Sequence, residues 1–340
     1  MKKERSSEGR AFGKIIISGE HSVLFRQPAV VRTISSLITR VSFYSANGSF
    51  KEPQNLISSR KEKNFSFSTF LKHPVFKEQS AILEATKNSV EKSIKNFIMN
   101  CHQKFCSYFY QGKGEDIFVK IDSNIMPGCG LGSSAALGVA LARAFSSWHR
   151  IPLSNQRIFQ FVREMENQCH YNSSGVDVYA AMGNGLNYYK GEERGFLSSQ
   201  LSIPFFAFQL GKTASSTAEV VEKVLEKDRP FSFWKNFGNI TSNIIRSLMT
   251  GDLKQILKSV RMNQTLLEEI SVVPTKTAAL IKEIQKMHNN KISGKISGSG
   301  AINGDSGGTV IFFGQVKERL IEEIVRSFGF PFQKLDLERT

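Results

Sequence analysis

Long hydrophobic runs are missing from this sequence of 340 residues. The longest ones, such as Ile15–Ile17 and Ala135–Ala142, fall far short of the roughly 20 apolar residues that a helix needs to span a bilayer. A secretory signal is not recognisable either, because residues 1–10 are rich in charge and the first apolar stretch ends at Gly19. We therefore expect a protein that neither spans a membrane nor is exported, and that works in the cytoplasm.

Cysteine is scarce, with four residues at irregular spacing. Cys101 and Cys106 lie on either side of His102, but no second C-x-x-C or H-x-x-x-H pair completes a tetrahedral zinc site. We expect these thiols, and those of Cys129 and Cys169, to be free in a reducing compartment rather than part of a disulfide framework or a metal site.

The two best-known phosphate-binding patterns are also absent. The sequence contains no G-x-x-x-x-G-K-[ST], and no G-x-G-x-x-G that is followed by an acidic residue at the end of the next strand. A P-loop NTPase and a dinucleotide-binding Rossmann domain are therefore not expected.

Acidic residues are fewer than basic ones: the sequence has 30 Asp and Glu and 45 Lys and Arg, which gives a net charge of +15. The basic residues are scattered, and none of them forms a long block with interleaved aromatic residues. Nucleic-acid binding is thus the weaker interpretation of the charge. A basic surface that attracts polyphosphate and carboxylate ligands is the stronger one.

The pattern of apolar residues predicts a folded protein of two domains. Mixed strands and helices precede residues 195–215, and mostly helical segments, a glycine-rich stretch and an α+β end follow. We therefore expect domains at 1–200 and 201–340. The predicted strands are Phe12–Ser18, Leu37–Tyr44, Phe65–Phe70, Asp116–Ile121, Ile203–Leu210, Thr309–Phe313 and an edge strand at Phe330–Leu337, and the main predicted helices are Gln79–Phe105, Ser133–Trp148, Asn155–Cys169 and Val316–Phe328.

The strongest functional signal is the segment Pro127–Ala136, which reads PGCGLGSSAA. Its three glycines remove side chains that would keep a phosphate away from the backbone. The helix predicted to begin near Ser133 would aim its free N–H groups and the positive end of its dipole at that anion. The alternative is a glycine-rich turn that merely starts a buried helix.

Three other segments complete a pattern along the chain. Gly13–Val30 reads GKIIISGEHSVLFRQPAV, Glu166–Asp177 reads ENQCHYNSSGVD, and Lys295–Gly308 reads KISGSGAINGDSGG. Together with PGCGLGSSAA they resemble the motifs of the GHMP kinases, a superfamily that includes galactokinase and the homoserine, mevalonate and phosphomevalonate kinases. Within the superfamily, the first motif most resembles that of the mevalonate kinases, because phosphomevalonate kinases usually carry a tyrosine at the position of His21. The resemblance implies an α+β fold with an N-terminal ribosomal-protein-S5-like α/β domain that binds ATP and a C-terminal ferredoxin-like α+β domain with extra helices.

The resemblance also implies an activity. ATP and Mg2+ would serve to phosphorylate the primary hydroxyl of a small-molecule alcohol, with mevalonate the favoured substrate and 5-phosphomevalonate the product. Asp177 would accept the hydroxyl proton, with Lys14 as its ionic partner, while Ser134 and Glu166 would hold Mg2+. The implied ATP-binding residues are Pro127, Gly128, Gly130, Leu131, Gly132, Ser133, Ser134 and Ala135, and the implied substrate residues are Glu20, His21 and Ser299.

Each of these assignments has a purely structural alternative. Asp177 could be the N-cap of a helix at Val178–Met182. Lys14 could be a surface lysine on a strand edge, Glu166 a solvated glutamate on a polar helix, and His21 a turn histidine.

The chain also departs from the family pattern. Arg26–Gln27 stands where the first motif often has glycine, Tyr171 replaces a glycine, Ser173 replaces a proline, and Asp305 lies in a longer third motif. The last two changes lie near the presumed substrate pocket, so they weaken the substrate assignment more than the fold or the reaction class. A kinase for phosphomevalonate or another small alcohol and a non-catalytic RNA-binding module stay as alternatives, and a homodimer is left open.

Overall fold

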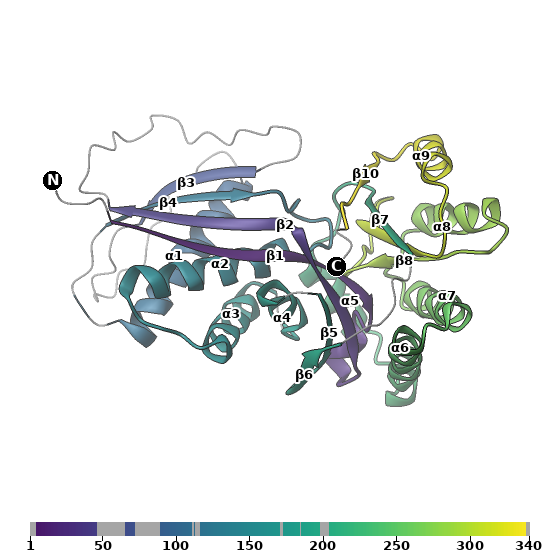
Figure 1. Cartoon of the computed structure of the whole chain (residues 1–340), viewed down its shortest axis with the longest axis horizontal. Helices are drawn as coiled ribbons and strands as arrows, with labels where there is room; N and C mark the ends of the chain where they lie inside the picture. The colour runs from purple at the N-terminus through teal and green to yellow at the C-terminus, as the bar shows by residue number, and fades with distance from the viewer. Residues whose placement is uncertain are drawn as a thin grey trace.

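The computed structural model describes residues 5–45, 65–71, 89–110, 112, 116–170, 173–183, 185–197 and 204–337. Its described elements form two β-sheets that are each covered by helices (Figure 1). Part of the helix predicted at Gln79–Phe105 and the altered position Tyr171 lie outside the described residues.

The first sheet has six strands in the order β3-β4-β2-β5-β6, and β1 pairs with β2 beside this path. All of its pairings are antiparallel. The first two strands are longer than their apolar runs predict, because their polar ends pair with each other from Ser6↔Tyr44 onward. The strands are β1 (Ser6–Ser18), β2 (Ala29–Ser45), β3 (Phe65–Leu71), β4 (Ile117–Ser123), β5 (Leu186–Lys190) and β6 (Glu193–Phe196), and a short 3-10 helix η1 (Ser22–Phe25) joins β1 to β2.

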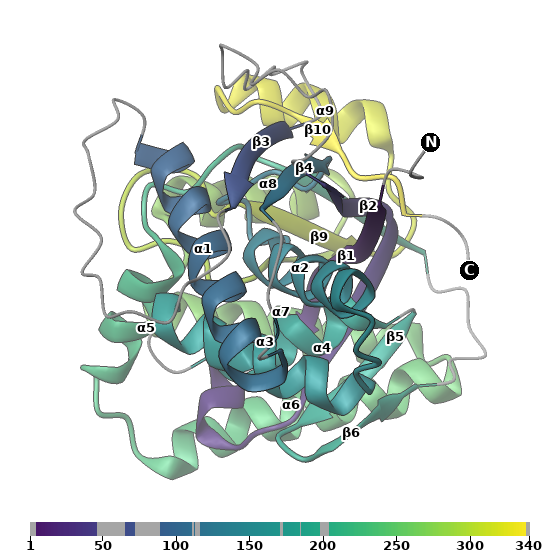
Figure 2. The same cartoon turned by 90° about the vertical axis from the view of Figure 1, so that its left-hand side faces the viewer.

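Helices cover one face of this sheet (Figures 1 and 2). The central helix, α2 (Ser133–His149), packs closely on β1, since a Cβ atom added at Gly9 would lie only 2.0 Å from the carbonyl oxygen of Ala140. The run of small residues in this helix permits that approach, and it accounts for the buried helix predicted at Ser133–Trp148. The helices are α1 (Ser89–Phe109), α2 (Ser133–His149), α3 (Asn155–His170) and α4 (Val176–Met182).

The second sheet has four antiparallel strands in the order β10-β7-β9-β8. The edge strand predicted at Phe330–Leu337 is present at the edge, but only Gln333–Lys334 pair. The strands are β7 (Phe205–Gln209), β8 (Ser293–Ser297), β9 (Thr309–Phe313) and β10 (Gln333–Lys334), and the helices are α5 (Thr217–Leu225), α6 (Phe231–Thr250), α7 (Leu253–Glu269), α8 (Thr275–Met287) and α9 (Glu318–Ser327).

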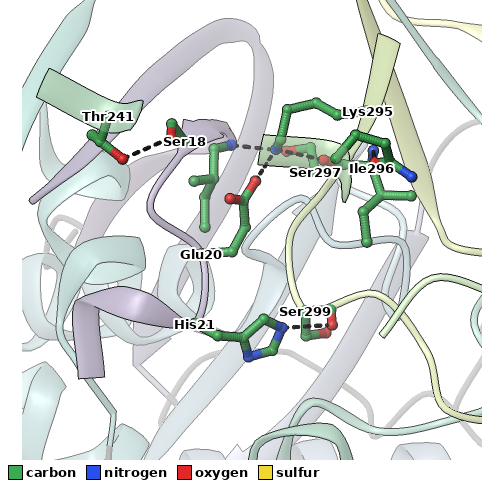
Figure 3. A network of polar contacts seen from close by, with 10 residues as sticks. Ser18, Glu20, His21, Thr241, Lys295, Ile296, Ser297 and Ser299 are labelled. Atoms are coloured by element: carbon green, nitrogen blue, oxygen red, sulfur yellow. Dashed lines mark hydrogen bonds and ion pairs between the residues drawn. The ribbon is translucent and has the colours of Figure 1, made fainter. Parts of the chain in front are cut away.

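The two halves share a packed junction. Ile240 and Ile244 of α6 belong to the same buried apolar cluster as the core of the first sheet. Two buried hydrogen bonds cross the junction: Ser18 Oγ lies 2.7 Å from Thr241 Oγ1, and the backbone N–H of Ile16 donates to Ser297 Oγ at 2.8 Å. The end of β1 is therefore fixed against the second half of the chain (Figure 3).

The predicted fold class is confirmed by this mixture of two sheets and their covering helices. The first sheet ends at Phe196 and the second begins at Phe205, so a division at 200 stays our proposal for the domain boundary. Within the described residues, no helix combines the length and apolar character needed to cross a membrane.

Candidate active site

A cavity of about 770 Å³ lies where the two halves meet. Its walls come from β1, the glycine segment before α2, the helices α3 and α4, the start of α5 and the loop after β8. Every residue assigned to the site from the sequence lines this cavity. The structure thus brings together four segments that are separated by up to 285 positions, as between Lys14 and Ser299.

The glycine segment needs its glycines for a local reason. Gly128, Gly130 and Gly132 have φ values of +77°, +77° and +74°, which disfavour any residue with a Cβ. A Cβ at Gly130 would also lie 2.7 Å from the carbonyl oxygen of Ser297. The backbone of this loop can therefore approach both the third glycine-rich segment and a bound anion.

The N-terminus of α2 opens into the cavity directly after this loop. Gly132 is the N-cap, and Ser133 and Ser134 begin the helix and line the cavity. The first N–H groups of a helix have no partner inside the helix, and its dipole adds partial positive charge there. The loop and the helix together are suited to binding phosphate.

Lys14 and Asp177 form an ion pair at the side of the cavity. Lys14 Nζ lies 3.0 Å from Asp177 Oδ1, and the lysine side chain is 3 % exposed while the aspartate side chain is 34 % exposed. Lys14 is therefore not a surface lysine on a strand edge. The N-cap of α4 is Gly175, so the alternative that Asp177 serves as a helix N-cap is wrong as well. The carboxylate is held by a buried cation while one side of it faces the cavity.

Ser134 and Glu166 bring two oxygen ligands together. Ser134 Oγ donates a hydrogen bond of 2.5 Å to Glu166 Oε1, and Glu166 is buried. Glu166 is thus not the solvated glutamate that a polar helix suggests. Hydroxyl and carboxylate oxygens beside an anion site are the donors that Mg2+ prefers.

His21 lines the cavity from the N-cap position of η1, and its ring approaches Ser299 (Figure 3). Its Nε2 lies 3.0 Å from the backbone carbonyl of Ser299 and donates to it. Burial lowers the pKa of His21 from 6.5 to about 4, the hydrogen bond to Ser299 opposes this shift, and the charge of Lys295 adds to it. The imidazole is therefore neutral at pH 7, and it acts through hydrogen bonds rather than charge.

Glu20 is paired with Lys295, a residue that was assigned no role in the sequence analysis. The side chains are 1 % and 0 % exposed, and Lys295 Nζ donates to Glu20 Oε1 and, at 2.6 Å, to the carbonyl of Ile296. Burial lowers the pKa of Lys295, and the carboxylate of Glu20 opposes that effect. Glu20 Oε2 is buried and has no hydrogen-bond partner among the described residues. It is a charged acceptor beside the cavity that a ligand hydroxyl can satisfy.

The connection from β7 to α5 also lines the cavity and was not predicted from the sequence. A Cβ at Gly128 would lie 2.8 Å from Lys212 Cγ, so the Lys212 side chain runs over the glycine loop. Ser216 and Glu219 form a capping box at the start of α5. The S-x-x-E spacing of these two residues is a signal from which the helix start could have been predicted. This connection adds the cation of Lys212 to the anion site, while the capping box occupies the N-terminus of α5.

The comparisons with known proteins agree with the family resemblance of the motifs. Residues 96–185 match the family model of the GHMP kinases N terminal domain. The chain is 29 % identical to the mevalonate kinase of Archaeoglobus fulgidus over 296 residues, which cover 86 % of this chain and 89 % of that relative. Among solved structures, it resembles the L. major mevalonate kinase in complex with R-mevalonate, with a TM-score of 0.67, 20 % identity and coverage of 96 % and 92 %.

The fold is also similar to that of a kinase that was solved with a different ligand. The structure of Lactococcus lactis galactokinase complexed with galactose superposes with a TM-score of 0.71 at 13 % identity, covering 97 % of this chain and 92 % of that one. Structural similarity at such identities shows the fold alone. The matched family model, the fold and the relatives confirm the resemblance seen in the motifs: this chain is similar to the GHMP kinases, and its residues 96–185 match the model of their N-terminal domain.

Proposed function

We propose that this protein is a mevalonate kinase, which transfers the γ-phosphoryl group of ATP to the primary hydroxyl of mevalonate. The observation that carries the proposal is that the Lys14–Asp177 ion pair faces the same cavity as the glycine loop. The similarity to mevalonate kinases over most of the chain supports the choice of substrate. We place the reaction in the cytoplasm, where ATP is abundant.

The phosphates of ATP bind at the glycine loop. The N–H groups at residues 128–135 and the start of α2 face the anion, and Lys212 adds a positive charge above Gly128. Ser134 and Glu166 fit Mg2+ because both offer oxygen atoms at one point beside this loop. When bound there, the ion neutralises charge on the phosphates.

Asp177 is the base in this mechanism. It accepts the proton of the primary hydroxyl as that oxygen forms its bond to the γ-phosphorus, and the bond to the β-phosphate breaks to release ADP. Lys14 orients Asp177 and stabilises negative charge that develops on the attacking oxygen. Positioning and charge stabilisation account for most of the catalysis in such transfers.

The substrate lies against Glu20, His21 and Ser299. Glu20 Oε2 is a buried acceptor that still lacks a donor among the described residues, and neutral His21 keeps one ring nitrogen as an acceptor because Nε2 donates to Ser299. Two acceptors suit the hydroxyl groups of mevalonate better than its carboxylate, which would be repelled by Glu20.

A coupled assay of ADP release tests the proposal, with mevalonate, phosphomevalonate, homoserine and galactose as acceptors. We expect turnover on mevalonate, with a kcat/KM at least tenfold above that on any other acceptor. Turnover on another acceptor but not on mevalonate would refute the substrate assignment and would still support the reaction class. A folded protein that releases no ADP with any of them, and binds RNA in a salt-sensitive manner, would refute the kinase.

A further inference from the structure

Three potential metal ligands meet at a point outside the catalytic cavity. His102 and Cys106 lie one turn apart on the same face of α1, and His149 is the last residue of α2. One ligand atom from each of the three lies within 4.8 Å of the other two. None of the three lines the cavity that contains Asp177.

The chemistry of these ligands is distinct from that of the Mg2+ site. Two imidazole nitrogens and one sulfur form a set that favours Zn2+ over Mg2+, which prefers oxygen. In a tetrahedral zinc site, neighbouring ligand atoms are about 3.3–3.6 Å apart, given bonds of roughly 2.0–2.3 Å. Shifts of about 1 Å would therefore bring this cluster into coordination geometry.

Aromatic packing holds both imidazoles in place. The ring of His102 stacks on Phe145 with centroids 5.0 Å apart, and the ring of His149 packs against Tyr110 at 4.1 Å and Phe105 at 5.7 Å. Such packing accounts for the two rings by themselves. Aromatic packing does not explain why the Cys106 thiol, from the next turn of α1, lies beside both imidazoles. A shared metal ion explains it, because all three side chains can then be ligands.

The surroundings also favour a cation with an open position. Cys106 lies in the last turn of α1, and His149 ends α2, so two helix C-termini with partial negative charge converge on the cluster. His102 and Cys106 are buried, whereas His149 is half-buried and gives access from solvent.

We propose that His102, Cys106 and His149 bind a zinc ion that links the C-terminal ends of α1 and α2, with water as the fourth ligand. The ion takes no part in the proposed phosphoryl transfer, since the cluster lies apart from the proposed catalytic residues. The proposal does not depend on the kinase activity. It is tested on the full chain by direct metal binding.

Cobalt(II) is the probe, because a thiolate bound to Co2+ gives a charge-transfer absorption band that oxygen ligands at the Mg2+ site cannot give. Chelator-treated protein is titrated with Co2+ and then with Zn2+. We expect one equivalent of Co2+ to produce the band and one equivalent of Zn2+ to abolish it. Zn2+ should also raise the Tm of the wild-type protein, because it binds the folded state.

The variants assign the band to its ligands. Cys106→Ser should remove it, and His149→Gln should weaken Co2+ binding by about tenfold or more. Cys101→Ser is the matched control, since Cys101 is also a buried thiol on α1 but does not belong to the cluster. It should retain both the band and the Zn2+ effect on Tm.

Two outcomes would overturn the proposal. One is a wild-type protein that shows no thiolate band. The other is a band that is produced by a different cysteine. Such a band would survive Cys106→Ser, and if it disappeared in Cys129→Ser the metal would lie at the glycine loop. If Cys106→Ser does not fold, His149→Gln decides, because its side chain is half-buried and its circular dichroism spectrum reports whether it folds.

Discussion

Replacement of Lys295 by methionine should leave a buried carboxylate without its cation. Methionine keeps most of the length and volume of the lysine stem, so the change removes the charge rather than the packing. Lys295 and Glu20 are 0 % and 1 % exposed, so solvent does not screen the pair. Removing one partner of such a pair costs about 3–5 kcal/mol of the free energy of unfolding.

Urea unfolding of four proteins measures this cost: the wild type, Lys295→Met, Glu20→Gln and the double variant. Each single change should destabilise the protein, because each leaves one charge buried alone. The double variant contains neither charge and should recover at least about 2 kcal/mol relative to the sum of the single changes. Lys276→Met is the matched control, since Lys276 and Asp305 form an ion pair that is 39 % and 63 % exposed. It should cost at most about 1 kcal/mol.

The pairing of Glu20 with Lys295 would be refuted if Lys295→Met cost no more than Lys276→Met. Strict additivity of the two single changes would contradict it as well, because partners in a buried ion pair do not act independently.

Three further predictions concern the cavity. Asp177→Asn should lower kcat by about 10²–10⁴-fold with little change in the Kd for ATP, measured by nucleotide titration, and near-normal kcat would remove Asp177 from the mechanism. Glu166→Gln should raise the Mg2+ concentration needed for half-maximal activity, and an unchanged Mg2+ titration would contradict its role as a ligand. The pKa of His21 is lowered from 6.5 to about 4, so the unfolded chain takes up its proton first and stability should fall by roughly 3 kcal/mol as the pH falls from 6.5 to 4. His21→Gln should remove that part of the pH dependence of unfolding, and an unchanged profile would contradict the burial of a neutral imidazole.

Much of the site could be predicted because its signals are local. The glycines of Pro127–Ala136 are required by their own positive φ values, which are a local property of the backbone, so their spacing carries the information. The helix that follows is equally local, since its small residues are contiguous. The motif resemblance then placed Lys14 and Asp177 in one site, and the structure brings them to 3.0 Å.

Pairing between distant segments could not be predicted in the same way. The polar ends of β1 and β2 are strands only because they pair with each other, which no apolar pattern reveals. Lys295 is 275 positions from Glu20, and a lone lysine in a short strand gives no sign of its partner. The same holds for His149, which the fold of α1 and α2 brings beside His102 and Cys106.

The central claim is spatial: the glycine loop binds a triphosphate whose terminal phosphorus faces residue 177. A crystal structure of Asp177→Asn with ATP, Mg2+ and mevalonate tests it most directly, since the change should slow the transfer enough to trap both substrates. We predict the triphosphate along residues 127–135, with the primary hydroxyl of mevalonate between its γ-phosphorus and the side chain at position 177. A nucleotide bound elsewhere, or a hydroxyl directed away from that side chain, would contradict the account.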